Sequence, residues 1–208
     1  IVGHLKNAQK YAANETQVKM IDSLIEHYQT GSVESHVKYS EHWVRDIDPV
    51  IETHQGFIEC YRDPKGCRCE FEGLVSCVDK EESKILHSFV DASDKILPLL
   101  PYPKQYERVT FTPPSYNALN ILSMNSSGLP IGINIPNYDE IRLEIGFKNV
   151  SLTNVMTSIQ TDKSVSDLLH PSMRDVFMEF SETIESLAVS AHELFGHGTV
   201  RLLKKEDV

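Results

Sequence analysis

The stretch Ala191-His192-Glu193-Leu194-Phe195-Gly196-His197-Gly198 places two imidazoles and one carboxylate within a run of helical periodicity. Neutral imidazole is a ligand that suits zinc, and a glutamate beside the first histidine is where a zinc hydrolase has its general base. In the familiar H-E-x-x-H motif the histidines are four positions apart, whereas His192 and His197 are five apart. Whether both can reach one metal ion therefore depends on the local helix geometry.

Five positions correspond to about 500° of rotation on a regular helix, so the two rings would point roughly 140° apart. Both can face one ion only if the helix contains a single wide turn, a π-bulge, and such bulges are frequent at functional sites. Gly196 lies where the backbone would have to loosen. The alternative is two unrelated surface histidines near a helix end. We therefore predict a wide turn between His192 and His197 if the pair binds metal.

The composition is that of an ordinary globular chain and argues against two classes of partner. The chain has 208 residues, of which 40% are hydrophobic and 24% are charged, which is ample for a hydrophobic core. A formal net charge of -10 argues against binding to nucleic acid. The sequence contains no run of about 18 apolar residues, so it predicts no membrane-spanning helix. Because the first residue is Ile1 rather than Met, we expect a piece of a longer protein.

Four cysteines, Cys60, Cys67, Cys69 and Cys77, lie close together in the sequence. Their spacing contains no C-x2-C knuckle, so the indication of a metal site is weak. With no secretory signal in view, reduced thiols are the default expectation. One disulfide and a cysteine-based metal site are the alternatives.

Helical and irregular segments can be placed from periodicity and punctuation. Asn14 is an expected N-cap and Gly31 an expected helix end. Five prolines between residues 98 and 114 predict an irregular connector. The expected helices are residues 4–13, 14–31, 33–46, 79–97 and 164 onward.

Residues 53–62 and 67–78 are expected to form the two strands of a β-hairpin. Between them lies Asp63-Pro64-Lys65-Gly66, in which proline favours a type I turn and glycine can take a positive φ. Runs with strand character on both sides of such a turn are a good hairpin signal.

Carboxylates line one side of this hairpin. Glu59 and Tyr61 share one face of the first expected strand, and Arg68, Glu70 and Glu72 share one face of the second. Such a row is either a solvated face or the wall of a polar cleft, and the residues alone leave both interpretations open.

A further strand is expected over residues 131–135, where isoleucine alternates with smaller residues. Pro130 and Pro136 cannot donate to a ladder, so this should be an edge strand. An edge has unpaired backbone groups with which an extended peptide can pair, and Asn134 and Asn137 could fix its end. An irregular strand with a turn-forming asparagine is the alternative.

Together these segments resemble a known family. The motif His192-Glu193-x-x-Gly196-His197 is similar to the H-E-x-x-G-H zinc signature of the dipeptidyl peptidase III family, in which five-residue spacing is the rule. Further segments match in order and spacing: Glu59-Cys60-Tyr61-Arg62-Asp63-Pro64, Gly66, Glu70-Phe71-Glu72-Gly73 and Gly132-Ile133-Asn134-Ile135-Pro136-Asn137-Tyr138-Asp139. The family's chain is several times longer, so the resemblance implies a central fragment.

The resemblance implies an α+β fold in which helical segments, a β-hairpin and edge strands contribute to two lobes. The family's lower lobe contains a five-stranded β-barrel, and its upper, mainly helical lobe holds zinc. Residues 1–79 (helices and hairpin) and 118–163 (strands) correspond to the lower lobe. Residues 80–117 (helix and proline-rich connector) and 164–208 (helices with the zinc motif) correspond to the upper lobe. We expect an incomplete barrel whose exposed apolar surface favours self-association.

The implied activity is that of a cytoplasmic zinc exopeptidase that releases dipeptides from the N-termini of short peptides. His192 and His197 match the two histidine ligands of zinc. Glu193 matches the general base that activates water. Tyr61 matches a tyrosine that stabilises the oxyanion.

Other matched positions concern the substrate. Glu59, Asn134 and Asn137 match groups that hold the N-terminal amine of the peptide, and a carboxylate opposite an ammonium would explain why such an enzyme counts from the N-terminus. Glu72 matches a cleft residue whose role is less defined.

The family's third zinc ligand is a glutamate from a later E-E-C-R-A-E-like motif, which this chain does not contain. Glu185 precedes His192 by seven residues, about 10 Å along a helix, and is too far away to replace it. We therefore expect weak zinc binding or none, and no turnover by this chain alone. The alternative function is a non-catalytic fragment or isoform that binds peptides or partners without zinc.

Overall fold

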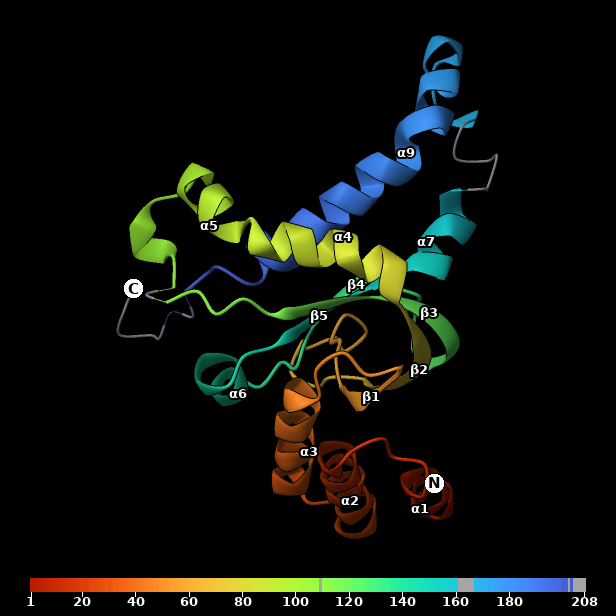
Figure 1. The fold of residues 1–208 in the computed structure, drawn as a ribbon, viewed down its shortest axis with the longest axis vertical. Coiled ribbons are helices and arrows are strands. Elements are labelled where there is room, and N and C mark those ends of the chain that lie inside the picture. The colour runs from red at the N-terminus through yellow and green to blue at the C-terminus, as the bar shows by residue number, and fades with distance from the viewer. Residues whose placement is uncertain (109, 161–166, 202, 204–208) are drawn as a thin grey trace.

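The computed structural model describes residues 1–108, 110–160, 167–201 and 203. Figure 1 shows a curled sheet between two groups of helices, which is the α+β fold expected from the sequence. On one side lie α1 (Val2–Gln9), α2 (Glu15–Thr30) and α3 (Val33–Arg45), and on the other lie α4 (Lys80–Asp91) and α9 (Pro171–Ala191).

Five strands form the sheet: β1 (Ile51–Phe57), β2 (Phe71–Asp79), β3 (Ser115–Asn125), β4 (Gly132–Ile135) and β5 (Lys148–Leu152). Their order is β1-β2-β3-β5-β4, and all neighbours are antiparallel except β3 and β5. The described residues thus form a five-stranded sheet, and the expectation that it is an incomplete part of a barrel stays a prediction. Within the described residues β1 and β4 form no ladder with each other, so the sheet is curled and open.

α2 and α3 begin and end where the sequence predicts, whereas α1 ends at Gln9 and is shorter than the predicted helix of residues 4–13. The Asn14 side chain accepts a hydrogen bond from the Gln17 backbone at 2.9 Å, and the Gln17 side chain accepts one from Ala13 at 2.8 Å. This reciprocal capping satisfies two backbone donors at the start of α2. Gly31, with a φ of 75°, ends α2 in the left-handed conformation.

Apolar side chains pack on both faces of the sheet because successive strand residues point to opposite sides. Leu119 of β3 contributes to the cluster that α2 and α3 cover. Tyr116 and Ala118 of the same strand contribute to a second cluster with α4 and with Leu194 and Phe195, which follow α9. The second cluster therefore ties the motif at the end of α9 to the sheet.

A buried ion pair crosses the sheet beneath α3. Lys148 Nζ lies 3.0 Å from Glu52 Oε2, and the two side chains are 1% and 2% exposed. Trp43 Nε1 donates to Glu52 Oε1 at 2.7 Å, and the Lys148 ammonium lies 4.5 Å from the centre of the Trp43 ring. Both charges are therefore compensated by direct contacts, which buried ions require.

The connections differ from expectation in detail. The helical pattern of residues 79–97 becomes α4, the short α5 (Ser93–Ile96) and a 3-10 turn, Leu97–Leu99. Another 3-10 turn, Lys104–Tyr106, interrupts the connector, which is otherwise irregular as predicted. Two helices, α6 (Asp139–Glu144) and α7 (Thr153–Gln160), and the strand β5 were not predicted.

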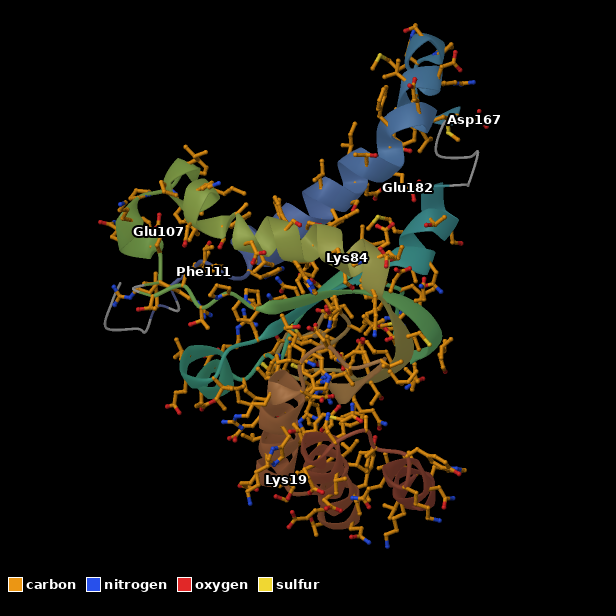
Figure 2. The ribbon with its side chains drawn as sticks, in the orientation of Figure 1. Lys19, Lys84, Glu107, Phe111, Asp167 and Glu182 are labelled. Carbon is orange, nitrogen blue, oxygen red and sulfur yellow. The ribbon has the colours of Figure 1, made fainter. Side chains whose placement is uncertain are left out.

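The N-terminal half of α9 extends beyond the sheet (Figure 2), and its expected start at residue 164 lies outside the described residues. The exposed large apolar side chains of α9 are Met173, Val176, Met178, Phe180, Ile184 and Leu187. Self-association through such a face remains a prediction. Among the described residues, no helix has the length and apolar character needed to cross a bilayer.

Candidate active site

Helix α9 continues into a wide turn, His192–Gly196, of π-helical form. The backbone N–H of His197 donates to the carbonyl of His192 at 3.1 Å, which closes a turn of five residues instead of four. The ring centres of the two histidines are 4.7 Å apart, with their planes at 87°. The predicted wide turn is therefore confirmed, and it brings the two imidazoles together.

Packing holds this turn in place. Leu194 is 0% exposed and Phe195 is 5% exposed, and the Phe195 ring packs edge-on against Phe89. A Cβ atom on Gly198 would collide with the backbone carbonyl of Leu194, whereas a Cβ on Gly196 would lie 3.8 Å from its nearest neighbour, His192 Nδ1. The glycine that the close packing requires is thus Gly198, and not the Gly196 singled out from the motif.

Three potential ligand atoms, one each from His192, Glu193 and His197, lie within 4.8 Å of one another. Two imidazoles and a carboxylate fit zinc in chemical kind, and zinc commonly takes four ligands. Glu185 lies on the same side of α9 and lines the same cavity, but within the described residues it is not part of this group. The turn can therefore hold a metal ion, with ligands still to be supplied from elsewhere.

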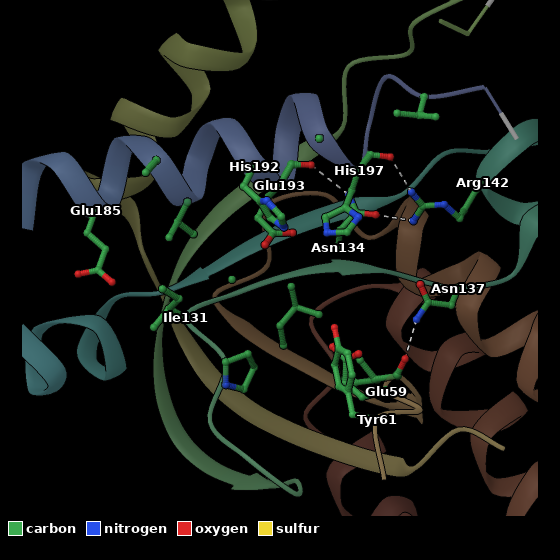
Figure 3. A pocket seen from close by; sticks show the side chains of 18 of the residues that line it. Glu59, Tyr61, Ile131, Asn134, Asn137, Arg142, Glu185, His192, Glu193 and His197 are labelled. Atoms are coloured by element: carbon green, nitrogen blue, oxygen red, sulfur yellow. Dashed lines mark hydrogen bonds between the residues drawn. The ribbon is translucent and has the colours of Figure 1, made fainter. Parts of the chain in front are cut away.

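A cavity of about 920 Å³ lies between this turn and the sheet (Figure 3). His192, Glu193 and His197 lie along one wall, and Asn134 of β4 lies beside them. β4 is an edge strand, as predicted, because in the described part of the chain it pairs with β5 alone. Gly132 of β4 lies so close that a Cβ atom there would be 2.8 Å from Glu193 Oε1.

The opposite wall is a long loop, and not the pair of continuous strands expected. β1 and β2 form the predicted hairpin, but residues 58–70 between them leave the regular ladder. The predicted turn is present, with Gly66 N donating to Asp63 O at 2.9 Å and a φ of 62° at Gly66. The Asp63 carboxylate accepts from the backbone of Cys67 and Arg68, so polar contacts rather than a ladder hold the loop.

This loop places Glu59 and Tyr61 on the cavity, across from the histidines (Figure 3). Tyr61 is 85% exposed, so this side of the cavity is open to solvent. Glu72 lies on β2, is only 3% exposed and is not among the residues that line the cavity. Its predicted role toward substrate therefore has no support from its position.

The carboxyl groups of the site have raised pKa values. Burial, and secondarily the Glu59 carboxylate, raises the pKa of Glu193 to about 7. Burial, and then the neighbouring Glu70, raises the pKa of Glu59. Burial, followed by the charges of His192 and Arg142, lowers the pKa of His197. The two walls are therefore electrostatically coupled across the cavity.

The two predicted asparagines have different contacts. Asn137 Nδ2 donates to the carbonyl of Ile58 at 2.8 Å, so it supports the loop that carries Glu59. Asn134 Nδ2 donates to the side chain of Asn149 and to the backbone of Glu193. Asn134 thus links the edge strand to the wide turn.

Arg142 is a site residue that the sequence did not reveal. Its guanidinium donates to Asn134 Oδ1, to Pro136 O at 3.1 Å and to His197 O at 3.2 Å. The same group lies 4.9 Å from the centre of the Phe147 ring. One buried cation therefore connects β4, its following turn and the residue after the wide turn. The only signal in the sequence is an arginine seven residues after the end of a strand.

The profile of Peptidase family M49 matches residues 1–208, which is the whole chain. Together with the fold and the His-Glu-His turn, this match defines the class: the chain belongs to Peptidase family M49.

Individual relatives agree with this assignment. Dipeptidyl peptidase 3 of Nematostella vectensis is 44% identical over 208 residues, and that of Dictyostelium discoideum is 42% identical over 202 residues. The human dipeptidyl peptidase 3 is 38% identical over 208 residues. These alignments cover 100%, 97% and 100% of this chain but only 28%, 29% and 28% of the relatives. The chain therefore spans little more than a quarter of their length.

Two solved structures share the fold. A dipeptidyl-peptidase III from Corallococcus sp. strain EGB matches with a TM-score of 0.80 at 19% identity, over 95% of this chain and 37% of that one. A DPP III from Caldithrix abyssi matches with a TM-score of 0.71 at 22% identity, over 84% of this chain and 34% of that one. At such identities the likeness establishes the fold, and the α+β expectation is confirmed.

Proposed function

We propose that this chain contributes the zinc motif and part of the peptide cleft to a zinc-dependent dipeptidyl peptidase that releases N-terminal dipeptides from short peptides. The observation that carries the proposal is the wide turn that brings His192 and His197 together above the cavity. Membership of Peptidase family M49 supports peptide hydrolysis as the reaction class. Because the chain spans little more than a quarter of its relatives, turnover would need the remaining parts of such a protein.

His192 and His197 would hold the zinc ion through their imidazoles. Zinc, when bound, acts as a Lewis acid on the scissile carbonyl. The Glu193 carboxylate, next to both rings, would take a proton from the attacking water and pass it to the leaving amine. Tyr61, which faces the cavity from the other wall, would donate a hydrogen bond to the developing oxyanion.

Glu59 and Asn137 would select the peptide's N-terminus. The Glu59 carboxylate lines the cavity and can pair with an ammonium group, and Asn137 supports the loop that carries it. The Asn134 amide oxygen accepts a hydrogen bond from Arg142 and has a second lone pair, with which it would accept one from the peptide's amine. We keep Glu72 as a more remote acidic residue that would act on substrate only through Glu59.

The two-lobe division rests on the two apolar clusters. We assign residues 1–79 and 118–163 to one lobe, whose core lies between the sheet and α2 and α3. We assign residues 80–117 and 164–208 to the other, whose α4 and Leu194 pack in the second cluster. The cavity would then lie where the two lobes meet, a frequent place for ligand sites.

The test compares zinc binding with turnover. The 208-residue chain is titrated with zinc in competition with a chelating indicator, and hydrolysis of a diarginyl arylamide is measured. The same assays are run on the Nematostella vectensis relative carrying this segment in place of its own. We expect weak zinc binding and no turnover by the chain alone, and zinc binding with turnover by the chimera.

His192→Ala and His197→Ala should each weaken zinc binding by the chain at least about tenfold, and Cys67→Ser is the matched control that leaves it unchanged. If the cysteine variant lost zinc and the histidine variants kept it, the proposal would be wrong. Turnover by the chain alone at the rate of the chimera would overturn the assignment to an incomplete site.

The second candidate function is a piece that binds peptides or partners without zinc. The observation that favours it is that the described residues supply only two imidazoles and one carboxylate at the turn. In that case a dipeptide amide would bind the chain equally well with a chelator present, and the chimera would take up no zinc through this segment.

A further inference from the structure

The loop opposite the zinc motif carries three of the four cysteines, and the backbone hydrogen bonds at its base indicate which two of them can pair. Cys60, Cys67 and Cys69 are all exposed free thiols, whereas Cys77 is half-buried on β2. None of them has a role in the proposed peptidase site. The ladder between β1 and β2 shows how they are arranged.

Within the ladder the register pairs Phe57 with Phe71. Beyond its end, Ile58 N donates to Glu70 O at 3.2 Å, but Glu70 N donates to Glu59 O at 2.6 Å. Two residues of the first strand therefore oppose one residue of the second, which is the pattern of a β-bulge. Such a bulge shifts the register by one residue, and a pairing continued one step in this register would set Cys60 opposite Cys69.

In a hairpin continued in this way beyond β1 and β2, the cysteine pair would follow a hydrogen-bonded position. It would therefore occupy a non-hydrogen-bonded position. Residues opposed in that way have Cα atoms about 4.5 Å apart. A disulfide requires Cα atoms about 4.4–6.8 Å apart, so a pair at such a position can be bridged. The two thiols also lie close enough to affect each other electrostatically. Burial raises the pKa of the Cys69 thiol most, and the charges of Cys60 and Glu59 raise it further.

The other two cysteines are placed differently. Cys67 Sγ donates to the Lys65 carbonyl at 3.3 Å, and its backbone N–H donates to Asp63, so this thiol is held within the turn. Cys77 pairs with Ile51 at the far end of the ladder. Neither is opposed to another cysteine.

We propose that Cys60 and Cys69 form a redox-responsive dithiol pair, which a low-molecular-weight disulfide oxidises to a cross-strand disulfide at the base of the Tyr61 loop. One thiolate attacks the oxidant, whose S–S bond breaks and releases one thiol, and the second cysteine then displaces the other. The pair loses two electrons and two protons, and the oxidant becomes two thiols. The disulfide closes the loop that begins directly before Tyr61, and the pairing holds whether or not the chain takes part in peptide hydrolysis.

The test uses the folded 208-residue chain, oxidised glutathione as the probe, and alkylation of the remaining thiols before digestion. Trypsin cuts after Lys65 and after Arg68, which separates Cys60, Cys67 and Cys69 onto three peptides. A Cys60–Cys69 disulfide leaves the outer two peptides joined until reduction and releases Gly66-Cys67-Arg68 in alkylated form. Because Cys77 lies on the same peptide as Cys69, the experiment is done with Cys77→Ser.

We expect the Cys60–Cys69 peptide to exceed the other two pairings at least about tenfold in the folded chain, and this preference to disappear when oxidation is done in urea. The joined peptide should vanish in Cys60→Ser and in Cys69→Ser and persist in Cys67→Ser. Glutathione retained on Cys60 or Cys69, or a disulfide that includes Cys67, would overturn the proposal.

Discussion

The two walls of the cavity are held by different forces. The wall with the wide turn is anchored by Leu194 and Phe195, which are 0% and 5% exposed in an apolar cluster. The loop wall presents Tyr61 at 85% exposure and is held mainly by hydrogen bonds to Asp63. The first wall therefore tolerates almost no change of volume, whereas the second can be altered without disturbing the core.

This difference corresponds to what each wall is proposed to do. Two imidazoles can share one metal ion only if their positions are fixed to a fraction of an ångström, so they lie on close-packed backbone. Groups that receive peptides of varied sequence benefit from adjustment, so they lie on an exposed loop above a rigid sheet.

The largest loss of stability at neutral pH should come from breaking the buried ion pair of Glu52 and Lys148, which forms a rigid base in the sheet. Lys148→Met would leave the Glu52 carboxylate, which is 1% exposed, buried without its cation. Removing one partner of such a pair costs about 3–5 kcal/mol of unfolding free energy. Urea unfolding followed by circular dichroism measures the loss. The control is the double variant Glu52→Gln, Lys148→Met, which should recover at least half of it, and a single-variant loss below about 1 kcal/mol would contradict the rigid base.

The next effect should come from the packed wall. In Gly198→Ala the added methyl group meets the Leu194 carbonyl, and overpacking of this kind costs about 1–3 kcal/mol. Gly196→Ala is the matched control, because its methyl group has room and alanine favours the helix by up to about 1 kcal/mol. Thermal unfolding of both variants decides the point. Equal behaviour of the two glycines would refute the claim that volume is restricted at Gly198.

An effect that is absent at neutral pH and develops in acid should come from two buried histidines, His36 and His54. Burial lowers the pKa of His54 to about 3, with further lowering by His36 and Lys148, and burial lowers the pKa of His36 to about 4. Unfolded imidazoles bind protons below about pH 6.5, whereas these folded ones do so only near pH 3–4. Their contribution to stability is therefore full above pH 6.5 and declines as the pH falls toward 4, by up to about 1.4 kcal/mol per pH unit for each histidine.

Urea midpoints between pH 7.5 and pH 4.5 measure this slope. His54→Gln should reduce the slope of the urea midpoint against pH by about half in that range. Above pH 7 the substitution should leave the pH dependence of the midpoint unchanged. A slope unchanged by the substitution would mean that other groups cause the acid sensitivity.

The smallest effect on stability should come from the exposed wall. Tyr61→Phe removes only a phenol that is 85% exposed, so the unfolding free energy should change by less than about 0.5 kcal/mol. In the chimera described above, the same change should lower turnover of the diarginyl arylamide about 100-fold, because an oxyanion donor is lost. Unchanged turnover would remove Tyr61 from the proposed chemistry, and a large loss of stability would contradict the open loop.

Features with a local cause were predictable from the sequence. The five-residue spacing of His192 and His197 required a wide turn, Asn14 and Gly31 set the ends of α2, and the prolines that flank β4 required an edge strand. Each of these follows from backbone geometry within a few residues. The ends of α2, the turn at Gly66 and the edge strand were therefore predicted correctly, while the lengths of α1, of the helix of residues 79–97 and of the hairpin strands were not.

Features that depend on distant contacts were not predictable. β5 is buried along its whole length, so it lacks the alternation that marks a half-exposed strand. Arg142 gained its position because β4, the turn after it and the residue following the wide turn meet around one guanidinium. No spacing within the sequence encodes such a meeting.

The amino-acid sequence by itself determined which groups can do chemistry: two imidazoles, a neighbouring carboxylate, a tyrosine loop and four thiols. The tertiary structure decided which of them face each other. Glu59 lines the cavity while Glu72 is buried outside it, and the hydrogen bonds of Ile58 and Glu70 favour Cys60 rather than Cys67 as the proposed partner of Cys69. The physical reason is that local geometry acts over one helical turn or one strand pair, whereas the opposition of side chains is set by the packing of the whole sheet and by one extra residue in a ladder.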